Sequence, residues 1–362
     1  MKNTFGNSIT ITLFGESHGD KIGAVLDGVA PGIEINYEYI KSKLALRRPF
    51  GSISTGRVES DDFEIASGMF NGYTTGAPIC ILIKNSNTHS SDYQDIKDNP
   101  RPSHADYTAK IKYNGFNDYR GGGHFSGRLT APIVCASAIL QYALEKKGIY
   151  IGSHICYMQG IEDCELSSKE DILKLGELNF PVLSDKASTQ MMEIINDVSK
   201  DGDSVGGVLE TLVLGMPKGV GEPWFDSLES VLSHALFSIP AVKGVEFGLG
   251  FGFADLNGEL ANDQFILDNG EIKTQTNNNG GINGGISNGM PIKFRSVIKP
   301  TPSIYKEQKT VNMATMTERT LQIKGRHDPA IIHRARVVVD SLTAFVLADM
   351  LCVKFGTDYL TK

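Results

Sequence analysis

Cysteines are few in this sequence, and their arrangement excludes a disulfide framework. The 362 residues contain five cysteines, an odd number, and none of them form a C-x-x-C pair. Cys80, Cys135 and Cys352 lie within strongly apolar segments. Buried free thiols in a reducing compartment explain this pattern better than disulfides or a zinc site.

Long apolar runs and an excess of positive charge are also missing. No stretch approaches the ~18 uninterrupted apolar residues of a membrane helix, and residues 1–6 lack the apolar core of a signal peptide. Acidic residues outnumber basic ones by 42 to 35, which gives a formal net charge of −7 and disfavours nucleic acid as the main partner. We therefore expect a cytoplasmic protein that binds neither a membrane nor nucleic acid.

The sequence shows no linker, charge block or long-period repeat that would divide it into domains. Its apolar fraction of 41% and charged fraction of 21% are ordinary for a globular protein, so the chain can bury a core. The Asn/Gly-rich tract at 276–289 is short, lies between strand-like segments and is by default a flexible loop. We predict a single α+β domain over residues 1–362.

Apolar periodicity predicts a mixture of strands and helices. Alternation over residues 8–14 and an apolar run at 22–29 predict a pair of strands, and Asn36 suits the N-cap of a helix that ends near Leu46. Residues 85–127 are polar and rich in turn formers, which is typical of a functional or mobile segment. Further helices are expected at 130–147, 228–236 and 333–351, and further strands at 63–67, 78–84, 149–158, 205–214 and 291–297.

Common nucleotide and zinc motifs are absent. There is no Gly-x-x-x-x-Gly-Lys-Ser/Thr loop and no His-Glu-x-x-His, and residues 248–253 lack the third glycine of a dinucleotide fingerprint. Residues 15–19 do match G-x-S-x-G, the nucleophile elbow of serine hydrolases. The elbow requires a helix after its serine, whereas residues 22–29 are predicted to form a strand. A serine hydrolase is therefore only a weak alternative, because the helix that its motif requires is not predicted. We expect no metal site.

Histidines and cations cluster instead in loops rich in glycine and proline. Polar groups on such turns can approach a ligand closely while the scaffold holds them in place. Each also has a purely structural interpretation: an isolated arginine is usually solvated, and a lone loop histidine is usually structural. Residues 326–329 can equally begin a helix, with Asp328 as the cap and Pro329 at the first helical position.

Taken together, these segments resemble the chorismate synthase family over essentially the whole chain. The resemblance is carried by Gly-Glu-Ser-His-Gly at 15–19, Arg-Pro-Ser-His-Ala-Asp at 101–106, Gly-Gly-Gly-His-Phe-Ser-Gly-Arg-Leu-Thr at 121–130 and Gly-Arg-His-Asp-Pro at 325–329. These motifs occur in the family's order and surroundings, which makes the combination highly specific.

The resemblance implies a fold of helices sandwiched between antiparallel sheets, assembled as a homotetramer. It also implies a lyase of the shikimate pathway. In that reaction 5-enolpyruvylshikimate 3-phosphate loses phosphate and a ring hydrogen by anti-1,4-elimination to give chorismate, the last common step of aromatic amino-acid biosynthesis. Reduced FMN is required, although the reaction has no net redox change.

The resemblance also assigns roles to residues. His18 would protonate the leaving phosphate, His104 would be the proton donor beside the flavin, and Asp328 would support proton return. Ser17 and Ser126 would act as relays. Guanidinium groups bind phosphate and carboxylate in bidentate fashion, which suits Arg47, Arg48 and Arg128 for the substrate. The predicted flavin contacts are Ser126, His124, Phe125, Gly284, Lys299, Pro300, Thr301, Pro302, Ser303 and Arg326.

The sequence departs from the common family pattern in several places. Residues 124–128 read His-Phe-Ser-Gly-Arg in place of Arg-Ser-Ser-Ala-Arg, residue 302 is proline in place of serine, and Asp340 replaces a usual glutamate. The two histidines and the aspartate of the predicted site are present, so we expect an active enzyme. Two alternatives stay open: a flavin reductase that uses NADPH, which some family members are, and a flavin or phosphate binder without catalysis.

Overall fold

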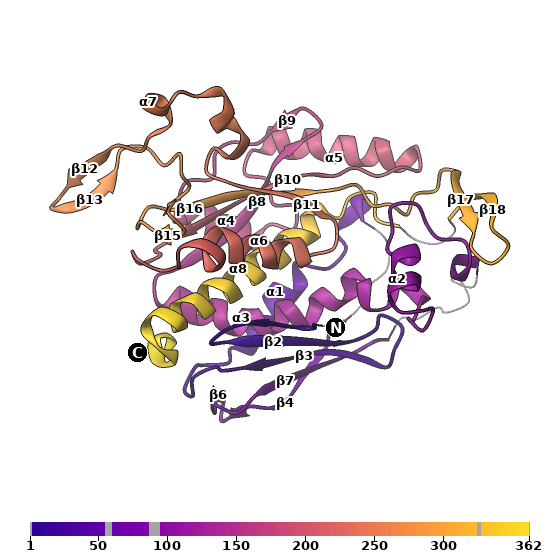
Figure 1. Cartoon of the computed structure of the whole chain (residues 1–362), viewed down its shortest axis with the longest axis horizontal. Coiled ribbons are helices and arrows are strands. Elements are labelled where there is room, and N and C mark those ends of the chain that lie inside the picture. Colours follow the sequence, from indigo (N-terminus) through magenta and orange to yellow (C-terminus); the bar gives the residue numbers. More distant parts are fainter. Residues whose placement is uncertain (1, 55–59, 87–94, 324–326, 362) are drawn as a thin grey trace.

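Two antiparallel sheets of five strands enclose a layer of helices in the computed structural model (Figure 1). The structure describes residues 2–54, 60–86, 95–323 and 327–361. The first sheet has the order β1 (Thr4–Gly6), β2 (Thr10–Gly15), β3 (Lys21–Asp27), β7 (Ile79–Lys84), β4 (Phe63–Ser67). The second has the order β11 (Val242–Phe247), β16 (Ile292–Ile298), β10 (Gly207–Leu214), β8 (Tyr150–Met158), β9 (Ile161–Glu162). The predicted α+β sandwich is confirmed.

The alternating sequence pattern decides which face of the first sheet is buried. The predicted strand pair at the start of the chain is present, because β2 pairs antiparallel with β3 from Thr10↔Asp27 to Gly15↔Ile22. Ile22, Ala24 and Leu26 of β3 are completely buried, as are the alternate isoleucines of β7. Side chains of alternate residues point to one side of a strand, so this sheet presents an apolar face to the helices.

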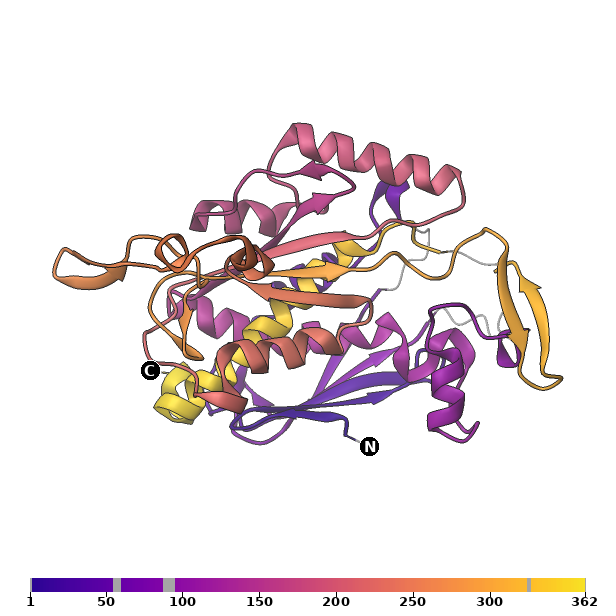
Figure 2. The ribbon, with the colours of Figure 1, turned by 45° about the horizontal axis from the view of Figure 1, so that its top comes forward.

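The helix pair α3 (Thr130–Lys146) and α8 (Ile332–Phe355) forms the middle layer (Figure 2). The two helices contact each other, while α3 also contacts β3 and β7 of the first sheet and α8 contacts β8 and β10 of the second. A helix buried on nearly every side belongs in a core and not on a surface. Both helices fit this description, since in α8 every residue from Ile332 to Cys352 except Arg334 is buried.

Shorter helices complete the layers. Asn36 caps α1 (Tyr37–Ala45) as predicted, because its Oδ1 accepts a hydrogen bond from the Tyr39 N–H at 3.0 Å. Helix α6 (Leu228–Ser238) packs on α8 and β11. Helix α4 (Lys169–Glu177) packs on β8, and helix α5 (Asp185–Lys200) lies beside the edge strand β9; the sequence analysis missed both helices (Figure 2).

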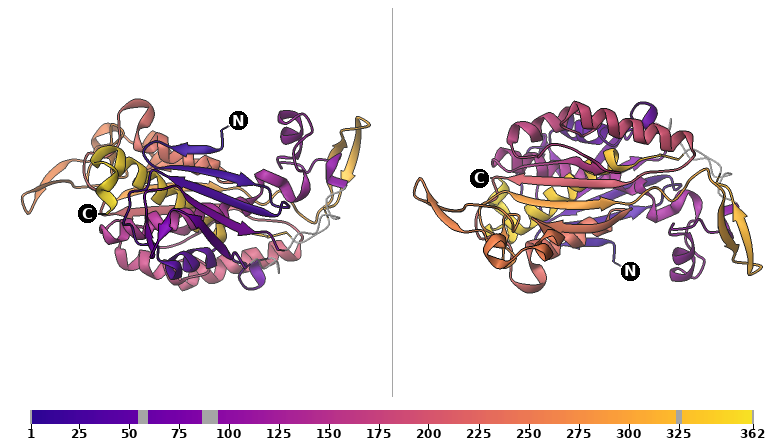
Figure 3. Two further views of the ribbon diagram at one scale, coloured as in Figure 1. Left: turned by 90° about the horizontal axis from the view of Figure 1, so that it is seen from below. Right: turned by 90° about the horizontal axis from the view of Figure 1, so that it is seen from above.

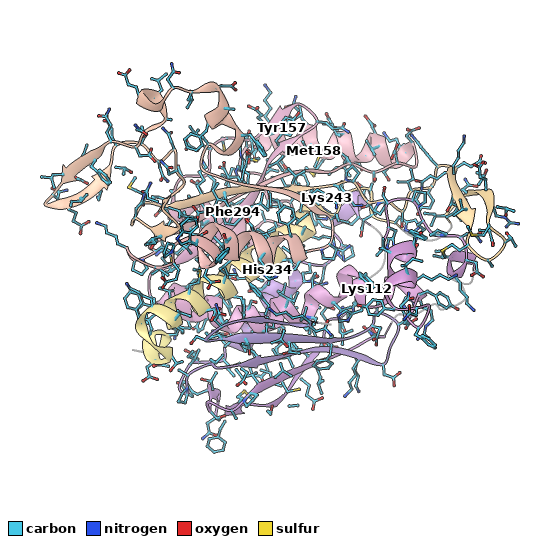
Figure 4. The ribbon with its side chains drawn as sticks, in the orientation of Figure 1. Lys112, Tyr157, Met158, His234, Lys243 and Phe294 are labelled. Carbon is cyan, nitrogen blue, oxygen red and sulfur yellow. The ribbon has the colours of Figure 1, made fainter. Side chains whose placement is uncertain are left out.

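Side chains of neighbouring strand residues in the second sheet have opposite environments. At the end of β8, Met158 is fully buried whereas the adjacent Tyr157 is 41% exposed, and Phe294 of β16 is fully buried (Figure 4). The remaining elements are α2 (Asp106–Lys112), α7 (Gly258–Ala261), β5 (Met69–Phe70), β6 (Tyr73–Thr74), β12 (Phe265–Asp268), β13 (Glu271–Thr274), β14 (Ile282–Asn283), β15 (Ile286–Ser287), β17 (Gln308–Asn312) and β18 (Thr317–Leu321).

The structure corrects three of the sequence predictions. The polar segment at 85–127 contains the short helix α2 in its described part. The sequence analysis missed this helix because it buries only Ala109 and therefore has little apolar periodicity. Helix α8 begins at Ile332, so the interpretation of Asp328 as its cap and Pro329 as its first residue is wrong. The Asn/Gly tract includes the paired strands β14 and β15, and three of its backbone and side-chain N–H groups near Asn279 donate to the Asp263 carboxylate.

The five cysteines are all free thiols, and Cys135 and Cys352 are buried as predicted while Cys80 is partly buried. Within the described ranges, no helix combines the length and the apolar character needed to cross a bilayer.

A buried histidine of the second sheet, His154 in β8, forms an ion pair with Asp163, which follows strand β9. His154 of β8 is 1% exposed; its Nδ1 lies 2.8 Å from Asp163 Oδ2 and its Nε2 lies 3.5 Å from Glu210 Oε1. Burial opposes protonation of this ring, but the hydrogen bond to Asp163 and the nearby Glu210 carboxylate outweigh it and raise the pKa of His154. The charged ring therefore contributes stability that is fully present below the pKa of an unfolded histidine and is lost as pH rises through the folded value.

We expect His154→Gln to lower the free energy of unfolding by about 3 kcal/mol at pH 6, because it leaves the buried Asp163 carboxylate without its cation, whereas Glu210 keeps its ion pair with Lys293. The loss should be smaller at pH 9, because the charged form of the wild-type ring becomes less populated as pH rises. Urea unfolding at the two pH values measures both. Lys200→Gln, which removes an exposed cation paired with Asp197, is the control and should change little at either pH. An equal loss at both pH values would contradict a charged His154.

Candidate active site

A cavity of about 290 Å³ lies where α3 and α8 begin. Segments far apart in the sequence contribute to its wall: the end of α1, the residue pair before β4, the turn before α3, the residues after α6 and the first turn of α8. The polar residues that line it are Arg47, Arg48, Asp61, Ser126, Arg128, Thr130, Asp328 and Arg334. The structure thus brings together all three predicted substrate-binding arginines with Ser126 and Asp328.

Arg47 is buried in this wall with a full set of partners. Its Nε and Nη2 donate to Thr130 Oγ1 at 3.2 and 3.0 Å, its Nη2 also donates to the Gly127 carbonyl at 3.3 Å, and its Nη1 donates to Asp61 Oδ2 at 2.8 Å. Burial lowers the pKa of the Arg47 guanidinium to about 10, although the Asp61 carboxylate opposes the shift. The side chain therefore stays charged at neutral pH and has a fixed orientation.

The other predicted cations face the same cavity. Arg128 donates from Nε to Asn85 Oδ1 at 3.0 Å and from Nη2 to the Lys84 carbonyl at 3.2 Å, and its Nη1 forms an ion pair with Asp61. Arg48 is held by the Ser60 carbonyl at 3.0 Å. With Arg334, four arginines face two carboxylates, so the cavity has an excess of positive charge and suits a multiply charged anion.

Sequence reasoning missed Arg334 and Asp61. Arg334 donates from Nη1 to Asp328 Oδ2 at 2.5 Å and from Nε to the Arg47 carbonyl at 2.6 Å, so it joins α8 to the end of α1. A signal for Arg334 was present in the sequence: it is a charged residue near the start of a helix that was otherwise predicted to be apolar and buried. Asp61 follows residues 55–59, which lie outside the described part of the chain, and no sequence pattern marks it.

A glycine turn brings the two predicted acids together beside Ser126, which lines the cavity; neither histidine is itself a lining residue. Gly121, Gly122 and Gly123 have φ values of 58°, 91° and 52°, a left-handed conformation that glycine adopts without strain. A Cβ on Gly121 would lie 2.1 Å from His18 Cε1, and one on Gly122 would lie 3.5 Å from His104 Cε1. Because only hydrogen atoms occupy these positions, the two histidines can both lie against the same short turn.

Ser17 and His18 are fixed on one side of this turn. The Ser17 N–H donates to the Gly123 carbonyl at 3.1 Å, and the Ser17 hydroxyl donates to the Arg120 carbonyl and lies 3.2 Å from His18 Nδ1. Both side chains are buried. The segment that follows is strand β3, so the helix that a nucleophile elbow requires is absent and the hydrolase alternative loses its structural basis.

His104 is held on the other side by a buried ion-pair group. Its Nδ1 lies 2.8 Å from Asp106 Oδ1, and Arg101 donates from Nε and Nη2 to the two oxygens of the same carboxylate at 2.8 Å each. Burial disfavours the ionised carboxylate, but the hydrogen bonds from Arg101 and His104 prevail and hold the pKa of Asp106 well below its usual range. Since Nδ1 faces Asp106, Nε2 is the nitrogen directed to the glycine turn.

The segment at 299–303, predicted to contact a flavin, reaches the His104 loop. Lys299 Nζ donates to the Ser103 carbonyl at 2.7 Å, and burial, with the neighbouring Lys243, lowers the pKa of this lysine (Figure 4). The Thr301 Oγ1 atom is buried and has no hydrogen-bond partner among the residues that the structure describes. Buried hydroxyls are normally paired, so Thr301 fits a ligand that supplies a polar atom.

The other residues of this segment are held by the protein. Ser303 is buried, the Thr301 carbonyl accepts a hydrogen bond from Ser204 Oγ at 2.7 Å, and the Pro302 carbonyl accepts one from Gln308 Nε2 at 3.4 Å. Pro300 lies between them and contributes no N–H. The backbone is thus fixed independently of a ligand, and the polar groups that fit a flavin are those of Lys299, Thr301 and Ser303.

Other predicted flavin contacts lie elsewhere. His124 donates from Nδ1 to the Gly15 carbonyl at 2.8 Å, and with Phe125, Gly15 and Glu16 it lines a second cavity of about 360 Å³. Gly284 lies in the turn between β14 and β15. Neither cavity-lining set includes it. Arg326 lies outside the described residues.

In the part of the chain that the structure describes, no group of three or more histidine, cysteine or carboxylate side chains has the arrangement of a metal site.

Two antiparallel sheets around a layer of helices, with an arginine-lined cavity where α3 and α8 begin, define the structural class: an α+β sandwich with a cation-rich cavity. Residues 9–352 match the chorismate synthase family. Chorismate synthases from Dehalococcoides mccartyi (strain BAV1) and Pyrococcus abyssi are 48% and 47% identical over 354 and 346 residues, which cover 97% and 96% of this chain and 96% of each relative. The chain therefore belongs to the chorismate synthase family.

A solved structure supports the same assignment. A crystal structure of chorismate synthase superposes with a TM-score of 0.76 at 30% identity, and the match covers 97% of this chain and 94% of that one. The similarity therefore extends over both sheets and the helical layer, as the resemblance predicted.

We expect Gly121→Ala to lower turnover by about 100-fold or more, because the added methyl group would displace the His18 ring from its place against the turn. Steady-state turnover of the purified variant measures this. Gly176→Ala on α4, where a Cβ meets nothing within 4 Å, is the control and should keep wild-type turnover. Near-normal turnover in Gly121→Ala would contradict the close packing of His18 on the turn.

Proposed function

We propose that this chain catalyses the anti-1,4-elimination of phosphate and a ring hydrogen from 5-enolpyruvylshikimate 3-phosphate to give chorismate. The observation that carries the proposal is the joint arrangement of four arginines around one cavity and of His18 and His104 on the adjoining glycine turn. The substrate carries one phosphate and two carboxylates, and the excess of cations matches it.

The arginines would bind and orient the substrate. Each guanidinium can form two parallel hydrogen bonds to a phosphate or carboxylate. Arg47 and Arg128 already have their planes fixed by the protein, so little side-chain entropy is lost on binding. Cations beside the leaving group also stabilise the negative charge that develops as the carbon–oxygen bond breaks.

His18 would deliver a proton to an oxygen of the departing phosphate. It is buried, and its Nδ1 lies 3.2 Å from the Ser17 hydroxyl, which would connect the ring to further donors. A positioned histidine suits this role because its charge changes near neutral pH.

The residues present fit reduced FMN, with Ser126, Lys299, Thr301 and Ser303 as its polar contacts. When bound, reduced FMN would supply electron density and a site for the ring hydrogen, which is not acidic enough for an ordinary base. His104 Nε2 would hold a proton at the flavin side of the turn, and the contact of Nδ1 with the Asp106 carboxylate at 2.8 Å fixes the orientation of the ring. Asp328, held by Arg334, would support return of the proton, so the cycle ends with no net redox change.

The test is an anaerobic assay of purified protein with 5-enolpyruvylshikimate 3-phosphate and chemically reduced FMN. Chorismate absorbance and phosphate release should rise together, and only with reduced flavin. Oxidised FMN plus NADPH in the same assay tests for intrinsic reductase activity. Folded protein that binds FMN but yields no chorismate would contradict the proposed function.

His18→Ala and His104→Ala should each lower turnover by about 10²–10⁴-fold, the usual contribution of a positioned acid. His234→Ala on α6, which removes a histidine that packs on Phe5 away from the cavity, is the control and should stay near the wild-type rate. Near-normal rates in both site variants would exclude the two histidines as the acids.

We further propose that the chain assembles as a homotetramer in the cytoplasm. Five free thiols suit a reducing compartment. The hairpin formed by β12 and β13 projects from the body of the molecule (Figure 3), and Phe265, Leu267 and Ile272 on it are 74%, 78% and 59% exposed. Apolar side chains gathered on a projecting arm are typical of a protein interface.

Phe265→Lys with Leu267→Lys should therefore convert the tetramer to smaller species, because charge at the centre of an apolar contact is costly to bury. Sedimentation equilibrium measures the mass. Lys309→Glu on β17, in the hairpin at the opposite end, is the control and should leave the mass unchanged. A wild-type chain that sediments as a monomer would refute the proposal.

A further inference from the structure

One carboxylate joins the two most strongly fixed arginines of the cavity. Asp61 lies directly before β4, lines the cavity and is 6% exposed. Its Oδ2 accepts a hydrogen bond from Arg47 Nη1 at 2.8 Å, and its Oδ1 forms the ion pair with Arg128 Nη1. Each oxygen therefore serves a different guanidinium, and no other described side chain is bonded to both.

The backbone at Asp61 has an uncommon conformation, which places the carboxylate between the two arginines. Its φ is 52°, in the left-handed region, where aspartate and asparagine are the best tolerated residues after glycine. This conformation costs free energy unless the surroundings compensate. The two bonds to arginine provide such compensation, because they are charge-assisted and shielded from water.

The arginines need a shared counter-charge. Burial lowers the pKa of Arg47 most, and the charges of Arg334 and Arg128 lower it further, as expected for like charges close together in the cavity wall. Arg47 has oxygen acceptors from Thr130 and Gly127, but these are neutral. Without Asp61, the like charges of Arg47 and Arg128 would face each other, and Arg128 would be driven away from the cavity.

We propose that Asp61 is a positioning residue that holds Arg47 and Arg128 as one preorganised clamp for an anionic group of the substrate. It does not touch the reacting atoms; it acts through the two guanidiniums. The inference rests on the proposed elimination for its kinetic readout, and on anion binding alone for a second readout that is independent of turnover.

Asp61→Asn is the decisive substitution. Asparagine keeps the size and the left-handed preference, but it removes the charge and leaves one acceptor oxygen for two arginines. We expect KM for 5-enolpyruvylshikimate 3-phosphate to rise by about 10–100-fold and kcat to change by less than about threefold, since the clamp would hold an anionic group whose charge is already present in the ground state, and not the oxygen on which charge develops. The apparent KM for reduced FMN should stay at its wild-type value.

A fall in KM would also have a clear physical meaning. Removal of a negative charge makes the cavity more positive, and if Asp61 merely competed with the substrate for the arginines, KM would fall. A lower or unchanged KM therefore overturns the proposal. The same holds if KM for the substrate and KM for reduced FMN rise together, because that pattern indicates a general structural disturbance.

Asp62→Asn is the matched control. It removes the same charge at the next residue, whose side chain is exposed and does not line the cavity, and it should leave both KM values unchanged. If Asp61→Asn does not fold, Asp61→Glu tests the proposal in its place, because glutamate keeps both carboxylate oxygens but moves them outward by one methylene group. Raised KM with wild-type kcat in that variant supports the proposal, and a wild-type KM overturns it.

Inorganic phosphate separates this inference from the proposed function. At constant ionic strength, titration calorimetry should show phosphate binding to the wild type and to Asp62→Asn, with a dissociation constant about 10–100-fold higher in Asp61→Asn. This result would support the role of Asp61 even if the wild type made no chorismate. Equal phosphate affinity in all three proteins would overturn it even if the wild type proved active.

Discussion

The structure depends on the burial of one helix pair between two sheets. Helices α3 and α8 contact each other, and each is also packed on one of the sheets, so neither sheet can bury its apolar face without them. Both helices begin at the same end of the molecule, where their first turns line the cavity. The constraint that forms the core therefore also places Thr130 and Arg334 across from each other, and the loops that precede the helices must converge there. Packing and site are two results of one arrangement.

Charge in the site is held by a few buried carboxylates. Asp61 joins Arg47 to Arg128, Asp106 joins Arg101 to His104, and Asp328 pairs with Arg334. Burial of so many cations near one another would be strongly unfavourable without these partners. The same pairs fix the directions of the guanidinium and imidazole groups before a ligand arrives, which is how an enzyme avoids reorganisation during the reaction. The same ion pairs therefore neutralise the cations and orient them for a ligand.

Glycine has a different part in the site. At Gly121 and Gly122 the backbone takes left-handed φ values and comes so close to His18 and His104 that a side chain at Gly121 would collide with the ring. The turn is therefore both a conformational requirement and a close approach. His124 and Phe125, where the sequence departs from the common family pattern, come directly after the turn but face a second cavity. These two departures thus lie away from the arginines, whereas a third, Gly127, lines the first cavity and accepts a hydrogen bond from Arg47 through its carbonyl.

The sequence by itself determined the elements and the family. Period-two alternation located β2, an apolar run located β3, helical period located α3 and α8, and Asn36 was identified as a cap, because these features depend on neighbours within a few residues. The motifs at 15–19, 101–106 and 121–130 indicated His18, His104 and Ser126 for the same reason. Only the tertiary structure showed Asp61 between two arginines, Arg334 against Asp328, and His124 turned from Ser126. These relations join residues up to 287 positions apart, as in the bond from Arg334 to the Arg47 carbonyl, and no local pattern records such a distance.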